Sequence, residues 1–347
     1  MIVLGLETSC DATSAAVVED GRLVRSCIIA SSSNDFTGSG GVIPEQAARE
    51  QLKSILPVIK RSLEAAGISH HDLDAIAVTH APGLLGSLLI GTTTARTLAL
   101  TWNKPLIPVH HTLGHLSSTW LIDNQKPETR NQKPDFPILA LSVSGGHSDL
   151  WLRRSHTDNK LLGSTIDDAA GEAFDKGAVL LGLPYPGGPA LAALAEKGDE
   201  TRYPFPKMLA HDTSLNFSFS GLKTSLKYLL RDLAAADTTI NDEDRASIAA
   251  SYQLAICNHL IRRLKQAIEM HSDVREIHLV GGVSANLRLR SMTEALGKEH
   301  GVIVRWPSTI RYCTDNGAMI AAAGTFLFQE QQSNEPMRFV TSAAKGL

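Results

Sequence analysis

The chain has 347 residues, a formal net charge of −3 and a hydrophobic content of 43%. This length exceeds one ordinary hydrophobic core and predicts two domains of globular composition. The weak negative charge excludes a global electrostatic footprint for nucleic acid, so RNA binding would need a local basic patch. We find no signal peptide and no apolar stretch long enough to span a membrane, and therefore expect a cytoplasmic protein. The four widely spaced cysteines predict reduced thiols.

The first 31 residues predict three strands joined by tight turns: "MIVLGLETS", "CDATSAAVVED" and "GRLVRSCIIAS". The first turn contains Thr8, Ser9, Asp11 and Thr13, all small polar residues. Residues 136–165 repeat this design with another apolar strand, a polar turn and a second strand. The repeat indicates an internal duplication, with one hairpin in each lobe.

Helices and further strands are expected between and after these hairpins. The polar, proline-punctuated segment 124–135 is typical of a linker, and Gly67 should end the first long helix. The alternation of strands and helices predicts an α/β fold, in which ligands bind beyond the carboxyl ends of strands. The expected helices are 44–67, 84–102, 244–271 and a buried, alanine-rich helix after residue 316; further strands are expected near 73–83, 276–280 and 302–307.

Two glycine turns follow apolar strands, "VSGGH" at residues 143–147 and "VGGVSAN" at residues 280–286. Glycine allows backbone N–H groups to approach phosphate or carbonyl oxygens closely. Either turn alone is equally well explained as a plain tight turn. The two together favour a nucleotide-type ligand in a cleft between lobes.

The polar run 167–191 contains further candidates. Asp167 and Asp168 are best explained as caps of the helix that follows them. Asp175 lies further into that helix, beside Lys176, where its carboxylate could accept hydrogen bonds from a ribose. Two basic segments, 259–265 and 286–290, are candidates for RNA contacts, although solvated helix faces explain them better.

His111 and His115 are four residues apart, which on a helix places both imidazoles on one face and within reach of one metal ion. A third ligand must come from elsewhere, and Asp315 lies in a loop before the expected buried helix. A metalloprotease HExxH motif would have glutamate after the first histidine, where this chain has Thr112. The spacing therefore leaves a metal site and a satisfied histidine pair about equally probable.

Nine specific strings follow one another over residues 4 to 324: "LETSCDAT", "GGVIPEQAARE", "APGLLGSLLIG", "HHTLGH", "VSGGHSDL", "DDAAGEAFDKGAVLLGLPYPGGP", "FSFSGLKTS", "GGVSANLRLR" and "YCTDNGAMIAAAG". In content and order they resemble the motifs of the TsaD family of tRNA N6-adenosine threonylcarbamoyltransferases.

This resemblance implies the two-lobed fold of actin, Hsp70 and sugar kinases (ASKHA), with a ribonuclease H-like core in each lobe. We expect an N-terminal lobe over 1–130, a linker over 124–135 and a C-terminal lobe over 136–315. The last helix, 316–332, should pack back on the N-terminal lobe.

The resemblance also implies an activity: transfer of a threonylcarbamoyl group from threonylcarbamoyl-AMP to the adenosine beside the anticodon, in tRNAs reading codons that begin with adenine. It implies one divalent metal between the lobes, iron or else zinc, held by His111, His115 and Asp315. It further implies a TsaB-type paralogue and a TsaE-type P-loop ATPase as partners. The substrate-binding positions it implies are Ser142, Val143, Ser144, Gly145, Gly146, Asp175, Gly188 and Asn286.

Asp11 is a candidate catalytic residue, with a turn-stabilising side chain as the alternative, and no general base is assigned. The chain departs from the family pattern at Ala12 and Leu113, where glutamate is usual, and at Ala48 and Gln51, where serine and histidine are usual. Three other classes are weighed: a metal-dependent peptidase, a non-catalytic paralogue, and a sugar kinase or ATPase. The complete motif set favours the transferase, and an imidazole pair does not suit a magnesium-dependent kinase.

Overall fold

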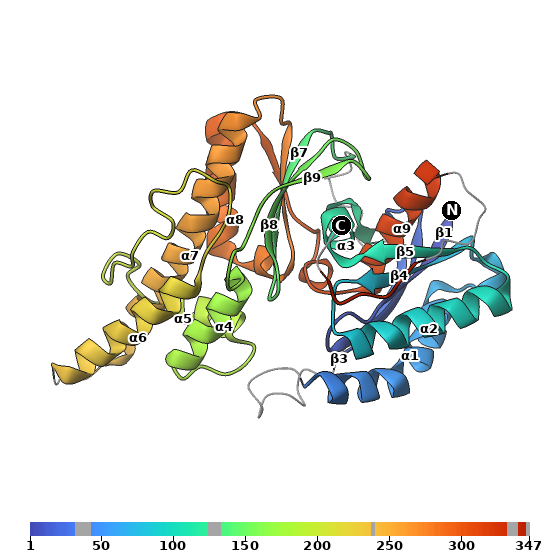
Figure 1. Cartoon of the computed structure of the whole chain (residues 1–347), viewed down its shortest axis with the longest axis horizontal. Coiled ribbons are helices and arrows are strands. Elements are labelled where there is room, and N and C mark those ends of the chain that lie inside the picture. The colour runs from blue at the N-terminus through green and yellow to red at the C-terminus, as the bar shows by residue number, and fades with distance from the viewer. Residues whose placement is uncertain (32–42, 124–132, 237–239, 332–338, 345–347) are drawn as a thin grey trace. The chain divides into compact units, whose positions relative to one another are not determined.

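Two β-sheets with the same strand order organise the chain (Figure 1). The computed structural model describes residues 1–31, 43–123, 133–236, 240–331 and 339–344. These residues cluster into unit 1, formed by 1–134, 155–158 and 306–347, and unit 2, formed by 135–154 and 159–305. Each unit contains one of the two sheets.

Unit 1 is built around a six-stranded sheet in the order β5-β4-β1-β2-β3-β6. Its elements are β1 (Ile2–Glu7), β2 (Ala12–Glu19), β3 (Leu23–Ser31), α1 (Pro44–Ala66), η2 (His70–Asp72), β4 (Ala75–Ala81), α2 (Leu85–Trp102), β5 (Leu106–His110), α3 (His111–Ser117), η3 (Ser118–Trp120), β6 (Ile122–Asp123), η5 (Ile310–Tyr312) and α9 (Gly317–Gln331).

Unit 2 has a five-stranded sheet in the order β11-β10-β7-β8-β9. Its elements are β7 (Ile138–Val143), β8 (Ser148–Arg153), β9 (Asn159–Ser164), α4 (Ala170–Leu180), α5 (Gly187–Ala195), α6 (Ser220–Ala235), α7 (Asp242–Met270), β10 (Glu276–Val280), η4 (Gly282–Ala285), α8 (Leu287–His300) and β11 (Ile303–Arg305).

The two sheets repeat one topology. In unit 1, β1 pairs antiparallel with β2, β2 antiparallel with β3, and β4 and β5 follow parallel to β1. The strands of unit 2 pair in the same way: β7 pairs antiparallel with β8, β8 antiparallel with β9, and β10 and β11 follow parallel to β7. The duplication predicted from the two hairpins is therefore present in the strand order.

The central strand β1 separates two hydrophobic cores. Val3 faces a core that includes the buried residues Ala318 to Ala323 of α9, whereas Leu4 and Leu6 face a core formed with α1 and α2. This alternation follows from the two-residue period of a strand, whose successive side chains point to opposite faces. The closing alanine-rich helix is buried, as the sequence predicted.

The main helices begin and end near the positions that the sequence predicted. Helix α1 starts with Pro44 and ends at Gly67, whose φ of 67° is left-handed and suits glycine. Helix α7 starts two residues earlier than expected, because Asn241 and Asp244 form a capping box.

Residues 306–315, which the sequence analysis placed in the C-terminal lobe, cluster with unit 1. Tyr312 is fully buried in the core on the α9 side of that sheet. The Ser308 hydroxyl donates a hydrogen bond to the carbonyl of Leu121. Residues 124–132 of the expected linker lie outside the described residues.

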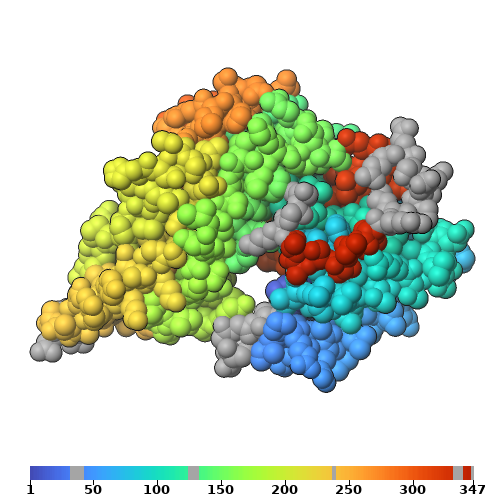
Figure 2. Space-filling view, in the orientation of Figure 1, coloured from blue at the N-terminus to red at the C-terminus, as the bar shows by residue number. Residues whose placement is uncertain are grey.

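The C-terminal segment 339–344 lies against α2 and β4 of unit 1 (Figure 2). Arg96 donates to the carbonyl of Phe339, and the amide of Ser342 donates to the carbonyl of His80. All four cysteines are free, as expected. Within the described ranges, no helix has the length and apolar character needed to cross a membrane.

Candidate active site

His111 and His115 lie on α3, the short helix that begins directly after β5. Both side chains are buried, and their ring centroids are 4.7 Å apart. The i, i+4 spacing therefore brings the two imidazoles together, as the sequence predicted.

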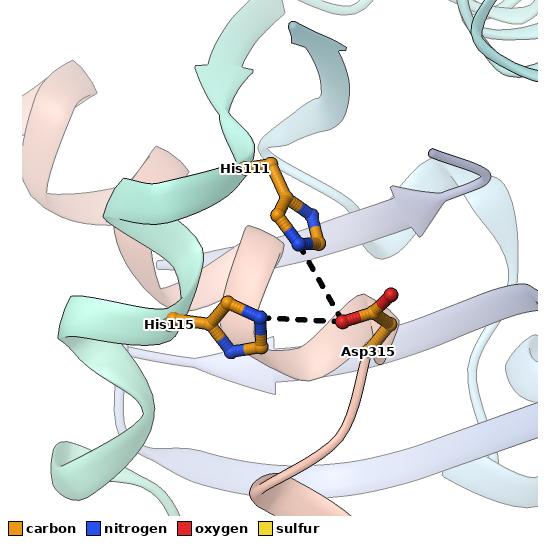
Figure 3. A group of neighbouring side chains, drawn as sticks. All are labelled: His111, His115 and Asp315. Atoms are coloured by element: carbon orange, nitrogen blue, oxygen red, sulfur yellow. Dashed lines mark ion pairs between the residues drawn. The ribbon is translucent and has the colours of Figure 1, made fainter. Parts of the chain in front are cut away.

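Asp315 approaches both histidines from the loop before α9 (Figure 3). Its Oδ1 atom is 3.5 Å from Nε2 of His111 and 3.2 Å from Nε2 of His115. One ligand atom from each of the three residues lies within 4.8 Å of the others, which is close enough for one metal ion. The structure thus brings together three residues from two distant parts of the sequence.

Close packing of α9 determines where Asp315 lies. A Cβ atom on Gly5 would be 2.1 Å from the carbonyl oxygen of Gly317, so only glycine allows α9 this near to β1. A Cβ atom on Gly114 would be 2.7 Å from the Cδ1 atom of Ile320, so α3 also lies close to α9. The helix carrying the histidines and the helix that follows Asp315 are therefore in direct contact.

The donor set fits a metal ion. Neither ring nitrogen of His115 makes a hydrogen bond within the described part of the chain, although the residue is 1% exposed. A buried ring nitrogen without a partner is costly, and a metal bound at Nε2 would give that nitrogen a partner. Burial opposes a positive charge on His111, but Asp315 and Glu7 outweigh it and raise the pKa of this imidazole to about 9. Carboxylates thus attract positive charge to this position.

Glu7, at the end of β1, is a residue that the sequence analysis missed. Its carboxylate is 1% exposed and lies 3.1 Å from Nδ1 of His111. A single glutamate in an apolar strand does not reveal its partner 104 positions away. The only signal was a charged residue at a position where the strand pattern requires burial.

The turn between β1 and β2 lies beside the cluster and carries Asp11. Burial, followed by the charges of Asp315 and Asp11, raises the pKa of the Cys10 thiol. Both carboxylates are therefore close enough to Cys10 to act on it. Gln51 of α1 holds the same turn, because its amide donates to the carbonyls of Cys10 and Ala12.

The departures from the family pattern in unit 1 have distinct surroundings. Gln51, where histidine is usual, is buried and hydrogen-bonded to the turn. Leu113 packs against the core on the α9 side of the sheet. Ala12 begins β2 opposite Ser31. None of these three replaces a member of the three-residue cluster.

The two glycine turns of unit 2 meet at one edge of its sheet. Val280 at the end of β10 is paired with Ser142 near the end of β7, and the two strands are parallel. The turn 142–146 and the turn that leads to Asn286 therefore lie side by side. A Cβ atom on Gly145, Gly146 or Gly282 would meet nothing within 4 Å, so internal packing does not require glycine at these positions.

Helix α4 carries Asp175, and the start of α5 carries Gly188. The amide of Gly171 donates to the carbonyl of Ser144, which joins the start of α4 to the first glycine turn. Oδ1 of Asp175 accepts hydrogen bonds from the amides of Gly187 (2.9 Å) and Gly188 (3.2 Å). Burial raises the pKa of the Asp175 carboxyl.

Asn286 is engaged within unit 2. Its Oδ1 accepts from the amide of Leu289 and caps α8, while its Nδ2 donates to Oε1 of Gln253 at 2.7 Å. Ser142 is fully buried, and its hydroxyl has no hydrogen-bond partner within the described residues. The structure therefore gathers the expected substrate-binding positions of unit 2 in one region.

The expected caps of α4 were wrong. Asp167 instead accepts hydrogen bonds from the amides of Phe219 and Ser220 at the start of α6. Asp168 pairs with Lys176 at 2.7 Å. The amide of Ala170 at the start of α4 donates to the hydroxyl of Ser148. Sequence proximity suggested the nearest helix, whereas the fold brings a hydroxyl from β8 to that position.

The two basic segments are largely occupied by internal contacts. Arg262 and Arg263 donate to carbonyl oxygens of the 208–216 loop. Arg288 forms a two-bond pair with Glu200, and Arg290 donates to the carbonyl of Ser284. Arg263 is 2% exposed, so the expectation of a solvated helix face is wrong for that part of 259–265.

The duplicated strand order and the two-histidine, one-carboxylate cluster define a protein of the actin-like α/β class. Two solved structures show this fold at low sequence identity. They are HypF from T. kodakarensis (TM-score 0.59, 15% identity, 95% of this chain and 48% of that chain) and component A of the (R)-2-hydroxyglutaryl-CoA dehydratase of Acidaminococcus fermentans (TM-score 0.51, 14% identity, 96% and 100%).

The chain belongs to the TsaD family, tRNA N6-adenosine threonylcarbamoyltransferase, whose family model matches residues 24–322. Among its relatives of that name, the protein of Symbiobacterium thermophilum is 46% identical over 94% of this chain and 92% of its own. The protein of Thermomicrobium roseum is also 46% identical, over 95% and 92%. The resemblance seen in the motifs is thereby confirmed.

Proposed function

We propose that the chain transfers the threonylcarbamoyl group of threonylcarbamoyl-AMP to N6 of the adenosine beside the anticodon, in tRNAs that read codons beginning with adenine. The observation that carries this proposal is the family match over residues 24–322. In the reaction, N6 forms a bond to the carbamoyl carbon, the bond from that carbon to the AMP oxygen breaks, and the amine loses a proton.

Residue chemistry disfavours the alternatives. A peptidase of the HExxH type needs a glutamate base, and Thr112 follows His111. A non-catalytic paralogue could have other residues at the three positions of the cluster. This chain has both histidines and Asp315, and their ligand atoms lie close enough together to bind one metal ion. The relatives that match nearly the whole chain carry the transferase name.

The proposed metal is Fe²⁺, held by His111, His115 and Asp315. Two histidines and one carboxylate with open positions are typical of non-haem iron, and the same donors also bind Zn²⁺. When bound, such an ion polarises a carbonyl or stabilises a phosphate oxygen. The chain itself supplies one carboxylate and two imidazole nitrogens, and both histidines are buried in unit 1.

The adenylate is proposed to bind at the sheet edge of unit 2, where parallel strands end. A Cβ atom on Gly145 or Gly146 would meet nothing within 4 Å, so the backbone at these two glycines is open to close approach by a ligand oxygen. Asp175 uses Oδ1 for backbone amides and has its other oxygen to accept from a ribose hydroxyl. Gly188 and Asn286 complete the proposed set.

Asp11 is the proposed catalytic residue of the β1–β2 turn, and this role is supported by its place in the same turn as Ser9, whose hydroxyl lies 3.2 Å from Nδ1 of His111. Proton transfer from the amine requires a base within hydrogen-bond reach of N6, and we assign that role to no residue. The turn is held by Gln51, so Asp11 is presented on a fixed backbone.

We further propose that the chain works in the cytoplasm with a TsaB-type paralogue and a TsaE-type P-loop ATPase. Because the chain has a weak negative charge, we propose that a partner protein supplies part of the surface that binds tRNA. Equal tRNA affinity of the chain alone and with the paralogue would contradict this proposal.

The test is threonylcarbamoyl transfer with purified components. The assay mixes the chain and its proposed partners with tRNA, threonine, bicarbonate, ATP and the enzyme that forms the adenylate. The tRNA nucleosides are then analysed by mass spectrometry. Modified adenosine is expected with the wild type and not with the His111→Ala, His115→Ala double variant. A folded, metal-loaded wild type that gives no product with active partners would overturn the proposal.

A further inference from the structure

Glu7 is a buried carboxylate whose described contacts are all with hydrogen-bond donors or an imidazole nitrogen. Oε1 accepts from the amide of Ser9 at 2.5 Å, and Oε2 accepts from the hydroxyl of Thr79 at 2.6 Å. The same Oε2 lies 3.1 Å from Nδ1 of His111. Ser9 lies in the β1–β2 turn, Thr79 in β4 and His111 at the start of α3, so partners from three parts of unit 1 fix the position of the carboxylate.

The two ring nitrogens of His111 face different carboxylates. Nδ1 faces Glu7, with the Ser9 hydroxyl also 3.2 Å away, whereas Nε2 faces Asp315 at 3.5 Å. A carboxylate at Nδ1 keeps the proton on that nitrogen and leaves the Nε2 lone pair for a metal. This is the arrangement in which an outer carboxylate orients a metal-binding histidine.

We propose that Glu7 is a positioning residue of the metal centre: it fixes the tautomer and ring orientation of His111 and thereby strengthens metal binding at Nε2. The inference rests on the metal site of the proposed function. It assigns Glu7 no contact with the metal, because the residue lies at the opposite nitrogen of the ring.

His115 provides an internal comparison. Its Nδ1 makes no hydrogen bond within the described part of the chain. Glu7 therefore acts on one of the two histidines, and its effect should disappear when His111 is absent. A role in folding alone would not depend on His111 in this way.

The experiment measures Zn²⁺ and Fe²⁺ affinity by competition with a chelator, in the wild-type full chain and in Glu7→Gln, His111→Ala and the double variant. Glu7→Gln should weaken binding about 10- to 100-fold, as is usual for the loss of such an outer partner. In the His111→Ala background the same substitution should change affinity less than about threefold, since the coupled ring is gone. Equal losses in both backgrounds would overturn the proposal.

Thr79→Val is the matched control, because it removes another donor to the same carboxylate oxygen at a fully buried position. It should weaken metal binding less than Glu7→Gln does. If Glu7→Gln does not fold, Glu7→Asp replaces it. This variant should lose less metal affinity than expected for Glu7→Gln, and the loss should again depend on His111.

Metal binding is measured without tRNA or adenylate, so the result is independent of the transfer assay. A wild type that binds metal but transfers nothing would contradict the proposed function and leave the role of Glu7 intact. A wild type that binds neither ion would overturn the role of Glu7.

Discussion

The side-chain amide of Gln51 donates a 2.8 Å hydrogen bond to the backbone carbonyl of Cys10. The same nitrogen lies 3.1 Å from the carbonyl oxygen of Ala12 and 3.4 Å from that of Thr8. One buried side chain of α1 thus holds both ends of the turn that carries Asp11. A neutral histidine at this position would offer one N–H donor, whereas the glutamine NH2 group offers two from a single nitrogen, so the glutamine changes how the turn is fixed.

Gln51→Leu should therefore destabilise the protein, because it leaves buried carbonyl groups without a donor. We expect a loss of about 1–3 kcal/mol in the free energy of unfolding, measured with urea. Gln46→Leu, at an exposed position of the same helix, should change it by less than about 0.5 kcal/mol. Similar losses for the two variants would show that the contacts to the turn contribute nothing.

Metal binding should stabilise the folded chain, because the three-residue cluster exists only in the folded state. At a free metal concentration one hundred times Kd, the gain is about 2.7 kcal/mol. Thermal unfolding with metal and with a chelator should show a clear difference in Tm for the wild type and none for His115→Ala. His211→Ala, at an exposed position in unit 2, should keep the full shift.

Gly5→Ala should weaken metal binding, although residue 5 is far in sequence from all three proposed metal ligands. The added Cβ would lie 2.1 Å from the Gly317 carbonyl oxygen and 2.5 Å from the Ala321 amide, so α9 must move away from β1. Overpacking of this kind costs about 1–3 kcal/mol. Because Asp315 precedes α9, chelator competition should also give a lower metal affinity.

Gly67→Ala is the control for the Gly5 substitution. Its Cβ would meet nothing within 4 Å, although its left-handed φ disfavours alanine. This variant should lose stability and keep its metal affinity. Unchanged affinity in Gly5→Ala would mean that Asp315 is placed independently of the contact between α9 and β1.

Glu276 should make unit 2 sensitive to acid. Burial opposes its ionisation, but hydrogen bonds from His278 and Arg305 outweigh it and lower the pKa of this carboxyl from 4.5 to about 2. Between pH 2 and 4.5 the unfolded chain therefore binds more protons than the folded chain. The contribution of Glu276 to the free energy of unfolding is fully present above pH 4.5 and is lost as the pH falls towards 2. The contribution at neutral pH is about 3 kcal/mol.

Glu276→Gln should remove this part of the acid dependence, as measured by denaturant unfolding between pH 2 and 7. Glu64→Gln is the control, because Glu64 is 62% exposed and lies 3.8 Å from Lys60. Surface pairs of this kind contribute less than about 1 kcal/mol. An acid profile unchanged by Glu276→Gln would contradict the assignment.

Asp175→Asn should separate the structural and ligand-binding roles of this side chain. The amide oxygen can still accept from the amides of Gly187 and Gly188, so stability should be nearly unchanged. The amide nitrogen cannot accept from a ribose hydroxyl, and AMP should bind about tenfold more weakly by calorimetry. Unchanged AMP affinity would limit Asp175 to capping α5.

Local patterns in the sequence predicted most of the secondary structure, because apolar periodicity and glycine ends are short-range signals. Both hairpins, the helix ending at Gly67 and the buried last helix were expected. The i, i+4 spacing also predicted that His111 and His115 share a helix face. These features depend on neighbours within a few residues.

Long-range contacts could not be predicted in this way. The histidine spacing did not identify the third member of the cluster; Asp315 was a candidate only from its loop before a buried helix, and the motif resemblance then implied it as a ligand. Glu7 was missed because its partners, Thr79 and His111, belong to other elements. Asp167 was assigned to the wrong helix because the start of α6 is more than fifty positions away. Such pairings depend on how strands and helices pack.

Unit 1 is interrupted in the chain by nearly all of unit 2. On the ribosome, His111 and His115 are therefore made some two hundred residues before Asp315. During that interval the nascent chain has the six strands of its first sheet but lacks α9, which covers one face of it. Asp315 and α9 are made only after all of unit 2. A chain that stops within unit 2 would therefore contain both histidines without Asp315, and one face of its first sheet would lack α9.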